Sequence, residues 1–330
     1  MAGFIAGLLG ATVSVATVFI FAGLGELIAE RAGVLNLGVE GMMLGGALGG
    51  FVVTVLTESP WLGFCVGIGV GMLLAGIHAF LCVTLKANQV ISGVMLTLLG
   101  TGLTTFYGAG WVDRSIDGFS EVTVPLVGQY LIQIPVIGEA LFSNTPTDYI
   151  ALALVPAVWY LLNRSNLGVE LVSVGEDPEM ADTMGVSVFK LRYLAVVIGG
   201  GFAGAAGAHL SLAFSQLWVP GMTAGRGWIA VALVIFAQWR PTRMLAGAYL
   251  FGMLDALQLR SQALSVSVGA DTPFAGLINA ALEFVMNAQI MSTYPYVATI
   301  MILSYAVIRT ESSQLAVPSA LLESYSRETD

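Results

Sequence analysis

Long uninterrupted runs of apolar residues dominate the sequence and limit what the chain can fold into. Hydrophobic residues make up 57% of its 330 residues, and Asp, Glu, Lys and Arg together only 10%, against about a quarter in a soluble domain. So few polar side chains do not cover a globule in water. The runs are continuous rather than alternating, which favours membrane-spanning helices over β-barrel strands. The sequence therefore predicts an all-α, polytopic helical membrane protein surrounded by lipid.

About 20 apolar residues cross the hydrocarbon core of a bilayer, so we expect about nine spans, with roughly eight to ten as the range. They lie near residues 3–24, 40–57, 61–84, 90–110, 148–163, 191–213, 227–239, 244–258 and 291–309. With nine alternating spans, most basic residues fall on one side, which the positive-inside rule makes cytoplasmic. The N-terminus is then outside and the C-terminus cytoplasmic, whereas an even count would change this arrangement.

The polar segments complete this expected organisation. A transmembrane domain covers 1–309 and includes a cytoplasmic loop at 164–190, and a cytoplasmic tail follows over 310–330. We also expect broken helices within the transmembrane domain, because glycine is abundant, with 40 residues, and membrane proteins use it in close packing and helix breaks.

Composition and motifs exclude several functions. A formal net charge of −9 is wrong for a nucleic-acid-binding surface. Cys65 and Cys82 lie inside apolar runs, so they predict neither a disulfide nor a metal site. The sequence has no Walker A loop, HExxH motif or credible nucleophile–base set, and we expect no catalytic residue and no cofactor in this chain.

The loop at 164–190 contains a compact set of helix signals. Asp177 followed by Pro178 is typical of a helix start, because the aspartate caps the first turn and proline has no amide hydrogen to satisfy. Glu179 suits the positive end of the helix dipole, and Gly185 favours a stop. We therefore expect two turns of helix here. Taken alone, such a helix could simply lie in the membrane interface.

The spacing of this helix resembles a motif of ATP-binding cassette (ABC) importer permeases. Glu179-Met180-Ala181 followed by Gly185 matches their EAA---G pattern, in which the short helix docks on a cytoplasmic ATPase. Five segments, SVGEDPEMADTMGVSVFKLRYLAVVIGGGFAGAAGAHLSL, GELIAERAGVLNLGVEGMMLGGA, ANQVISGVMLTLL, GMTAGRGWIAVALVIFAQWRP and LFGMLDALQLRSQ, resemble permeases of the branched-chain amino acid, ribose and nucleoside importer superfamily. They are most similar to its lipoprotein-dependent nucleoside branch. The likeness runs from about Gly25 to Arg309.

The resemblance implies a transport subunit that works with partners. A separate cytoplasmic ABC ATPase would bind ATP and Mg and hydrolyse the nucleotide. A second permease, a related paralogue or another copy, would complete the path, and an extracytoplasmic solute-binding lipoprotein would deliver the solute at the cell membrane. Nucleosides are the first expectation, with simple sugars and branched-chain amino acids as alternatives. The rival of another class is an ion-coupled secondary transporter or a channel; a membrane subunit that does not transport fits poorly.

The resemblance also implies a set of ATPase-coupling residues: Glu176, Asp177, Pro178, Glu179, Ala181 and Gly185. Some positions depart from the family pattern. The usual Gly-Glu-Asn is Gly-Glu-Asp at 175–177, Glu170 and Ser173 stand where basic residues are frequent, and Thr97 replaces an Asn of the fourth span. Aspartate caps a helix as well as asparagine does, so the docking geometry should survive, although the added charge could alter which ATPase surface fits. Thr97 weakens the expectation of a polar solute contact there.

The segment GELIAERAGVLNLGVEGMM, residues 25–43, interrupts two apolar runs with four charges and four glycines. Glu26 and Glu30 are four apart and share a helical face. One interpretation is a cytoplasmic turn with solvated charges. The other is a broken helix that enters the bilayer, where irregular backbone and charge need protein or water around them. Asn36 and Glu40 are the first residues to test, and Glu40→Ala is expected to abolish uptake while leaving assembly intact.

Further polar residues among the spans complete the candidate transport pathway. The full set is Glu26, Asn36, Glu40, Asn88, Gln89, Trp218, Asp255 and Gln258. The two amides Asn88 and Gln89 could contact a nucleobase or ribose, or could join helices by hydrogen bonds. For Trp218 we expect an interfacial anchor, with stacking on a solute base as the alternative.

Two charged residues and the glycine pairs are expected to serve packing. Asp255 shares a helical face with Gln258, and pairing with Arg226 or Arg260 is favoured over a solute contact. Arg31 could pair with an acid on a neighbouring segment. The glycine spacings, such as Gly46–Gly50, indicate tight helix contacts inside the subunit or against a second permease.

Overall fold

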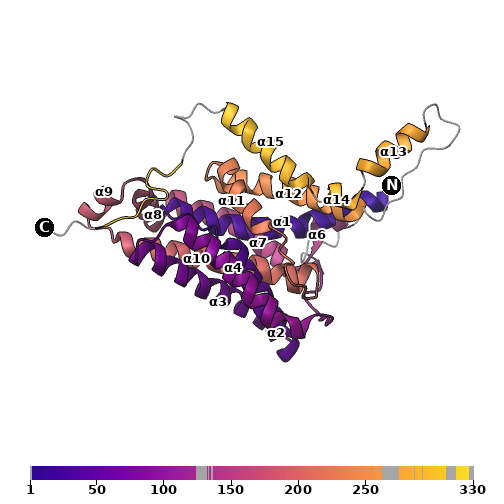
Figure 1. Ribbon diagram of the computed structural model, residues 1–330, viewed down its shortest axis with the longest axis horizontal. Coiled ribbons are helices and arrows are strands. Elements are labelled where there is room, and N and C mark those ends of the chain that lie inside the picture. Colours follow the sequence, from indigo (N-terminus) through magenta and orange to yellow (C-terminus); the bar gives the residue numbers. More distant parts are fainter. Residues whose placement is uncertain are drawn as a thin grey trace.

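The computed structural model describes residues 2–123, 132, 134, 137–261, 275–285, 287–291, 293–309 and 317–326. Within these ranges nearly all regular structure is helical (Figure 1), which confirms the expected all-α class. The helices are α1 (Ala2–Arg31), α2 (Val39–Thr57), α3 (Pro60–Ala79), α4 (Gln89–Gly108), α6 (Ile137–Phe142), α7 (Pro146–Arg164), α8 (Asn166–Glu176), α9 (Pro178–Thr183), α10 (Val188–His209), α11 (Arg226–Ala237), α12 (Pro241–Ser261), α13 (Ala275–Val285), α14 (Ala288–Met291) and α15 (Tyr294–Arg309).

Short elements extend or connect these helices. The π-helical turns η1 (Phe80–Thr84) and η3 (Leu210–Phe214) continue α3 and α10, and the 3-10 turn η2 (Ala109–Trp111) continues α4. Two-residue strands β1 (Val122–Thr123) and β2 (Ser143–Asn144) pair antiparallel beside α6.

Each of the nine expected spans falls largely on described helices, although residue 292 of the last span lies outside the described residues. Among the described residues, five helical stretches are long and apolar enough to cross a bilayer: Phe4–Arg31, Val39–Thr57, Pro60–Thr84, Gln89–Trp111 and Val188–Phe214. The remaining helices on expected spans are shorter or less apolar, such as α11 with 12 residues. The polytopic architecture is therefore confirmed, whereas the count of nine spans stays a prediction.

Local sequence signals explain where several helices begin. The amide of Leu62 donates to Ser59 Oγ at 3.4 Å, and proline follows Ser59 at the first position of α3. In the same way Asn88 Oδ1 accepts a hydrogen bond from the amide of Ile91 at 3.1 Å at the start of α4. These caps satisfy amides that lack a partner in the first helical turn.

The interior is built from α10, α1 and α2. Helix α10 packs against α3, α1 and α2, and α1 packs against α12, α11 and α7. Glycine permits the closest of these approaches: a Cβ atom at Gly46 of α2 would lie 2.5 Å from the carbonyl oxygen of Gly204 in α10. The glycine pairs noted in the sequence therefore serve packing within this subunit.

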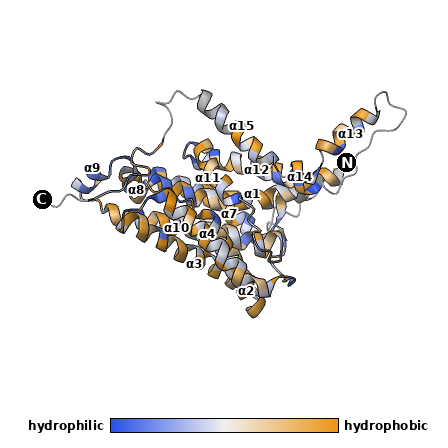
Figure 2. Ribbon diagram, viewed as in Figure 1, coloured by the Kyte–Doolittle hydropathy of each residue, from blue (hydrophilic) through white to orange (hydrophobic). Residues whose placement is uncertain are grey.

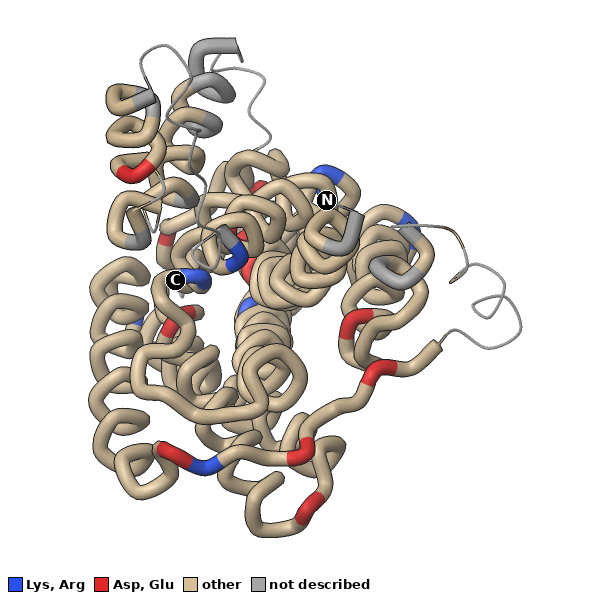
Figure 3. The backbone as a smooth tube through the Cα atoms, turned by 90° about the vertical axis from the view of Figure 1, so that its right-hand side faces the viewer, with Lys and Arg blue, Asp and Glu red and all other residues tan. Residues whose placement is uncertain are grey.

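Charge is sparse along these helices. The long helices are mostly apolar in Figure 2, whereas α9 is hydrophilic. Figure 3 shows that Lys, Arg, Asp and Glu occupy few positions along the backbone. The N-terminal end of α1 and the short helix α9 lie at opposite ends of the long axis in Figure 1. This arrangement separates the start of the chain from the loop at 164–190.

Candidate functional site

The short helix predicted in the loop at 164–190 is present as α9. Asp177 Oδ1 accepts a hydrogen bond from the amide of Met180 at 2.9 Å, and Pro178 occupies the first helical position. Gly185 has a φ of +88°, a left-handed backbone conformation that residues other than glycine rarely adopt. It therefore ends the helix where the sequence indicated.

Helix α9 has a buried side and an exposed side. Ala181 is buried against a small cluster that includes Val174, Val188 and Leu191. On the opposite side, Met180 is 63% and Met184 80% exposed. Two flexible apolar side chains at the tip of a polar loop form a surface suited to contact with another protein.

Helix α8, which leads into α9, was not anticipated from the sequence. Its first turn is capped by Ser165, whose Oγ accepts a hydrogen bond from the amide of Gly168 at 3.0 Å. Leu171 and Val174 are fully buried in the interior. The signal was available, since a serine cap precedes apolar residues at helical spacing.

The C-terminal segment 317–326 lies on α8, α9 and α10. The amide of Ala320 donates to the carbonyl oxygen of Gly175 at 2.9 Å, and Arg192 Nη1 donates to the carbonyl oxygen of Glu323 at 2.9 Å. Tyr325 belongs to the cluster that buries Ala181. We call residues 317–326 the C-terminal strap. The other parts of the expected tail, 310–316 and 327–330, lie outside the described residues.

The polar segment between α1 and α2 is buried within the protein. The amide of Asn36 donates to Glu26 Oε1, and the amide of Leu35 donates to Gln89 Oε1, both at 2.8 Å. Asn36 is 0% and Glu26 1% exposed. Because these side chains are buried, the segment is not a turn with solvated charges in this structure. Polar groups away from water need hydrogen-bond partners, and the bonds described here supply them. Three of the pathway candidates meet at this turn.

Glu40 connects the start of α2 to the start of α11. Its Oε1 accepts hydrogen bonds from Thr223 Oγ1 at 2.6 Å and from the amide of Gly225 at 2.8 Å, and its Oε2 accepts one from the amide of Gly227 at 2.7 Å. A Cβ atom at Gly227 would lie 2.7 Å from Glu40 Cα. The carboxylate thus satisfies amides at a helix N-terminus, a packing role that the sequence did not suggest.

Glu30 and Arg31 connect the end of α1 to the turn between α11 and α12. Trp239 Nε1 donates to Glu30 Oε2 at 2.6 Å, and Arg31 Nη2 donates to the carbonyl oxygen of Trp239 at 3.2 Å. Arg31 Nη1 also lies 3.9 Å from Glu176 Oε1, so the expected acidic partner is found. Glu26 Oε2 and Glu30 Oε1 are buried and accept no hydrogen bond among the described residues.

Asn88 and Trp218, two further pathway candidates, have contacts that stabilise the fold. Asn88 is exposed and caps α4. Trp218 is 0% exposed and packs against Leu44 and Phe51 of α2, so the expected interfacial anchor is wrong. Just before Trp218 in the chain, the carbonyl oxygen of Gln216 accepts a hydrogen bond from the amide of Ile116 at 3.2 Å.

Asp255 and Gln258 are the candidates that line a cavity. Arg226 Nη2 lies 2.7 Å and Arg226 Nε 2.8 Å from Asp255 Oδ2, which confirms the favoured ion pair. The cavity is about 340 Å³ in volume. It is lined by Phe19, Ala224, Arg226, Ile229, Asp255, Gln258, Leu259 and Tyr296. Ionised and amide groups therefore face a shared space between α1, α11, α12 and α15.

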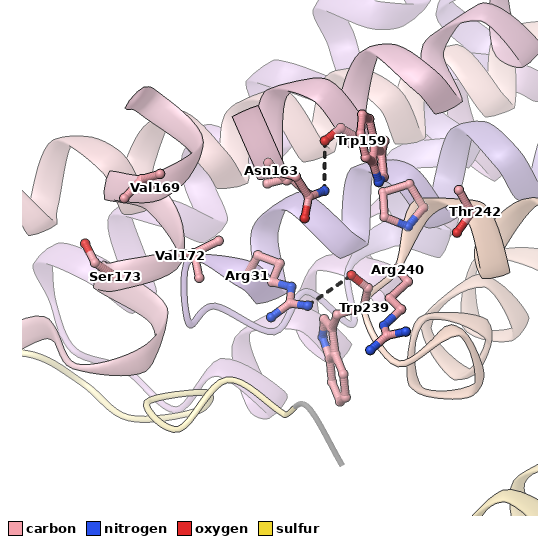
Figure 4. Close-up of a pocket in the computed structure, with 11 residues that line it drawn as sticks. Arg31, Trp159, Asn163, Val169, Val172, Ser173, Trp239, Arg240 and Thr242 are labelled. Carbon is pink, nitrogen blue, oxygen red and sulfur yellow. Dashed lines mark hydrogen bonds between the residues drawn. The ribbon is translucent and has the colours of Figure 1, made fainter. Parts of the chain in front are cut away.

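A larger cavity of about 750 Å³ lies between the end of α1, the α7–α8 hairpin and the α11–α12 turn (Figure 4). It is lined by Arg31, Trp159, Leu162, Asn163, Val169, Val172, Ser173, Trp239, Arg240, Pro241 and Thr242. We call it the arginine cavity, because the guanidinium groups of Arg31 and Arg240 both line it.

A buried polar network joining α1, α7 and α10 was missed. His209 Nδ1 lies 2.8 Å from Thr147 Oγ1, and Asp148 Oδ1 accepts a hydrogen bond from Thr17 Oγ1 at 2.7 Å. Asp148 Oδ2 also accepts from the amide of Thr145 at 2.8 Å. Threonine three residues before aspartate, with proline between, was the available signal. Among the described residues, no group of three His, Cys, Asp or Glu side chains is placed to hold a metal ion.

Comparison with known proteins gives a consistent result. Residues 8–308 match the family model described as branched-chain amino acid transport system / permease component. A Haloferax volcanii protein named "Putative glucose ABC transporter permease protein" is 73% identical over 327 residues, 99% of both chains. A guanosine ABC transporter permease protein of Bacillus subtilis is 33% identical over 76% of this chain and 81% of its own. A nucleoside ABC transporter permease protein of Lactococcus lactis is 32% identical over 87% and 88%.

Second permeases from two of these organisms are also similar. A glucose ABC transporter permease protein of Haloferax volcanii is 25% identical over 83% of this chain and 75% of its own. Another guanosine ABC transporter permease protein of Bacillus subtilis is 27% identical over 74% and 72%. Each organism thus has two different permeases, both similar to this chain and named for the same solute.

Proposed function

Because the chain belongs to the permease components of the branched-chain amino acid transport systems, a family of ABC transporter membrane subunits, we propose that it carries a simple sugar in an ABC importer. Membership makes the chain a multi-pass membrane protein and a transport subunit rather than an enzyme, since ATP is hydrolysed by a separate chain. The substrate, the partners and the roles of individual residues are what the proposal adds.

One observation carries the choice of solute: the 73% identity over 99% of both chains to a protein whose name specifies glucose. The nucleoside permeases are 32% and 33% identical, which makes a nucleoside the second candidate. The expectation that placed nucleosides first is not confirmed. A pocket contact can change with a few substitutions, so the solute requires a direct measurement.

We assign the coupling to the ATPase to α9 and its flanks, at Glu176, Asp177, Pro178, Glu179, Ala181 and Gly185. The support is geometric, since the cap at Asp177 and the buried Ala181 fix a rod whose exposed Met180 and Met184 point away from the bundle. Closure of an ATPase pair would move this rod, and α8 would transmit the movement to the end of α1 through the contact of Glu176 with Arg31.

We place the solute pathway beside the cavity of Asp255 and Gln258, because an ionised residue and an amide face it together. Glu26, Asn36, Glu40 and Gln89 would instead support the pathway wall, since the hydrogen bonds described above occupy them. The proposed topology has α9 and the C-terminus on the cytoplasmic side of the cell membrane, with an extracytoplasmic binding lipoprotein at the opposite face. A related but different permease would complete the transporter.

Uptake by cells tests the solute. A strain lacking the gene should lose accumulation of labelled glucose at micromolar concentration, and the wild-type gene should restore it. A large excess of unlabelled guanosine should leave the restored uptake unchanged. Loss of guanosine uptake with glucose uptake intact would instead support the nucleoside permease.

The energy source separates the ABC importer from the ion-coupled alternative. Glucose uptake should persist when an ionophore collapses the ion gradients while ATP is maintained, and it should stop when ATP is depleted. Uptake that follows the gradients and continues without ATP would contradict the assignment, because a secondary transporter needs no ATPase partner.

A further inference from the structure

We propose that the arginine cavity binds the phosphate head group of an anionic membrane lipid. The cavity is formed where three parts of the chain meet: the last residue of α1, the α7–α8 hairpin and the first turn of α12 (Figure 4). It lies apart from the proposed solute pathway, although Arg31 in its lining also contacts Glu176 of the proposed coupling path. The inference rests on the proposed topology, which puts this end of the bundle on the cytoplasmic side, and it concerns the lipid surroundings of the subunit.

The charge of the cavity is the first argument. The whole chain has 12 Lys and Arg residues against 21 Asp and Glu, yet two arginines line this cavity and its described lining contains no acid. Arg31 and Arg240 place two like charges on the wall of one cavity, which is unfavourable without a counter-charge. Glu176, 3.9 Å from Arg31 Nη1, offsets part of this positive charge from outside the lining, and an anion bound in the cavity would offset more of it.

The geometry of the donors is the second argument. Arg31 Nη2 donates a hydrogen bond to the carbonyl oxygen of Trp239. None of the other residues drawn in Figure 4 accepts a hydrogen bond from the Arg240 guanidinium. Pro241 and Thr242, the first two residues of the 21-residue helix α12, also line the cavity. Guanidinium forks and the positive end of a helix together favour a phosphate group.

The apolar wall is the third argument, and it selects a lipid over a soluble anion. Leu162, Val169 and Val172 line the cavity together with the arginines, and Trp159, also in the lining, is 40% exposed. A tryptophan with one polar edge is typical of the level of the lipid head groups. Basic pockets between helices at the cytoplasmic surface bind anionic lipid head groups in membrane proteins, and this pocket adjoins α8, beside α9.

Native mass spectrometry of the purified full-length chain in a nonionic detergent tests the assignment. The probes are a short-chain phosphatidylglycerol, the phosphatidylcholine with the same acyl chains, and inorganic phosphate. The wild type should retain one phosphatidylglycerol in preference to phosphatidylcholine. Arg240→Gln should weaken this binding about fivefold, the effect expected for one basic residue close to an anionic head group.

Two further variants separate binding from folding. Arg243→Gln removes the same charge from the same helix but outside the cavity, and it should leave the binding unchanged. Thr242→Asp places a negative charge in the first turn of α12, where it favours the helix but opposes an anion in the cavity, so the thermal midpoint should hold while lipid binding falls. Equal binding of both lipids, equal loss in Arg243→Gln, or competition by inorganic phosphate at the lipid's own concentration would overturn the proposal.

Discussion

Buried acidic residues in this protein connect segments that are far apart in the sequence. Glu40 binds the turn that starts α11, Glu30 accepts from Trp239, Asp148 accepts from Thr17, and Asp255 pairs with Arg226. A carboxyl group away from water requires hydrogen-bond partners, and each of these acids obtains at least one from a segment that is distant in the sequence. Intramembrane acids often mark a transport pathway, but here most of them fix the positions of helices.

Glu40 gives the sharpest prediction for a single residue. Glu40→Ala leaves two backbone amides and the hydroxyl of Thr223 without their acceptor, so the free energy of unfolding should fall by about 3 kcal/mol, with about 1–3 kcal/mol for a single unsatisfied group. Chemical denaturation of the purified chain in detergent measures this loss. Assembly should suffer together with uptake, which revises the expectation drawn from the sequence.

A second acid, next to the other end of α2, serves as the control. Glu58→Gln, at the exposed C-cap of α2, should change the free energy of unfolding by less than about 0.5 kcal/mol, as exposed substitutions usually do. If the Glu40→Ala variant proved as stable as the wild type but inactive, the packing role would be contradicted and a direct role in transport restored.

At the scale of elements, α9 is short and depends on its cap. A six-residue helix has little stability of its own, so it is held by Asp177 at one end, by the burial of Ala181, and by the C-terminal strap on its inner side. The element is therefore an assembly of three parts of the chain rather than a local motif.

Removing the cap should uncouple transport. Asp177→Ala costs about 1 kcal/mol of helix stability, and it should lower ATP-driven uptake severalfold in a reconstituted importer while the amount of assembled protein is unchanged. Asp177→Asn retains a side-chain acceptor and should keep most of the uptake. Equal uptake in all three proteins would show that the cap does not matter for coupling.

The C-terminal strap should be needed to order α9. A chain that ends at residue 316 loses the bonds to Gly175 and Arg192 and the contact of Tyr325. Hydrogen exchange of the amides at 178–186 should then accelerate about tenfold or more, because local opening becomes easier. A chain that ends at residue 326 keeps the strap and is the control. Unchanged exchange in the shorter chain would mean that α9 is ordered without the strap.

At the scale of the whole molecule, one outer helix presents a broad apolar face. Leu98 is 61%, Met95 58% and Phe106 73% exposed on α4. In a membrane protein such a surface faces lipid or another subunit. In the hetero-pair proposed above, part of this surface would be covered by the related permease.

Co-expression tests this pairing. The chain with an affinity tag should co-purify a related permease of the same organism in equal amount, and uptake should require both. The control is the tagged chain expressed with a second, untagged copy of itself. Full ATP-driven uptake from that combination would contradict a hetero-pair and favour two identical subunits.

Local sequence alone was enough to predict the class and the long apolar helices, although not α8. Continuous apolar runs of about 20 residues predict membrane-spanning helices. The expected spans fall largely on helices because the length and hydropathy of a run are local properties of the sequence. The Asp177-Pro178 start and the Gly185 stop were predictable for the same reason, since a cap acts within a few residues of the chain. The pairing of Asp255 was predictable because a lone acid in an apolar run needs a nearby base.

What the polar residues contact, in contrast, was settled by the packing of distant helices. Glu40 and Gly225 are 185 positions apart, Glu30 and Trp239 are 209 apart, and hydropathy contains no information about which helices become neighbours. The inward position of Trp218 and the strap on α9 follow from the same long-range packing. In a lipid environment helices associate by close fit and hydrogen bonds rather than by burial from water, so their partners are fixed only when the whole chain is assembled.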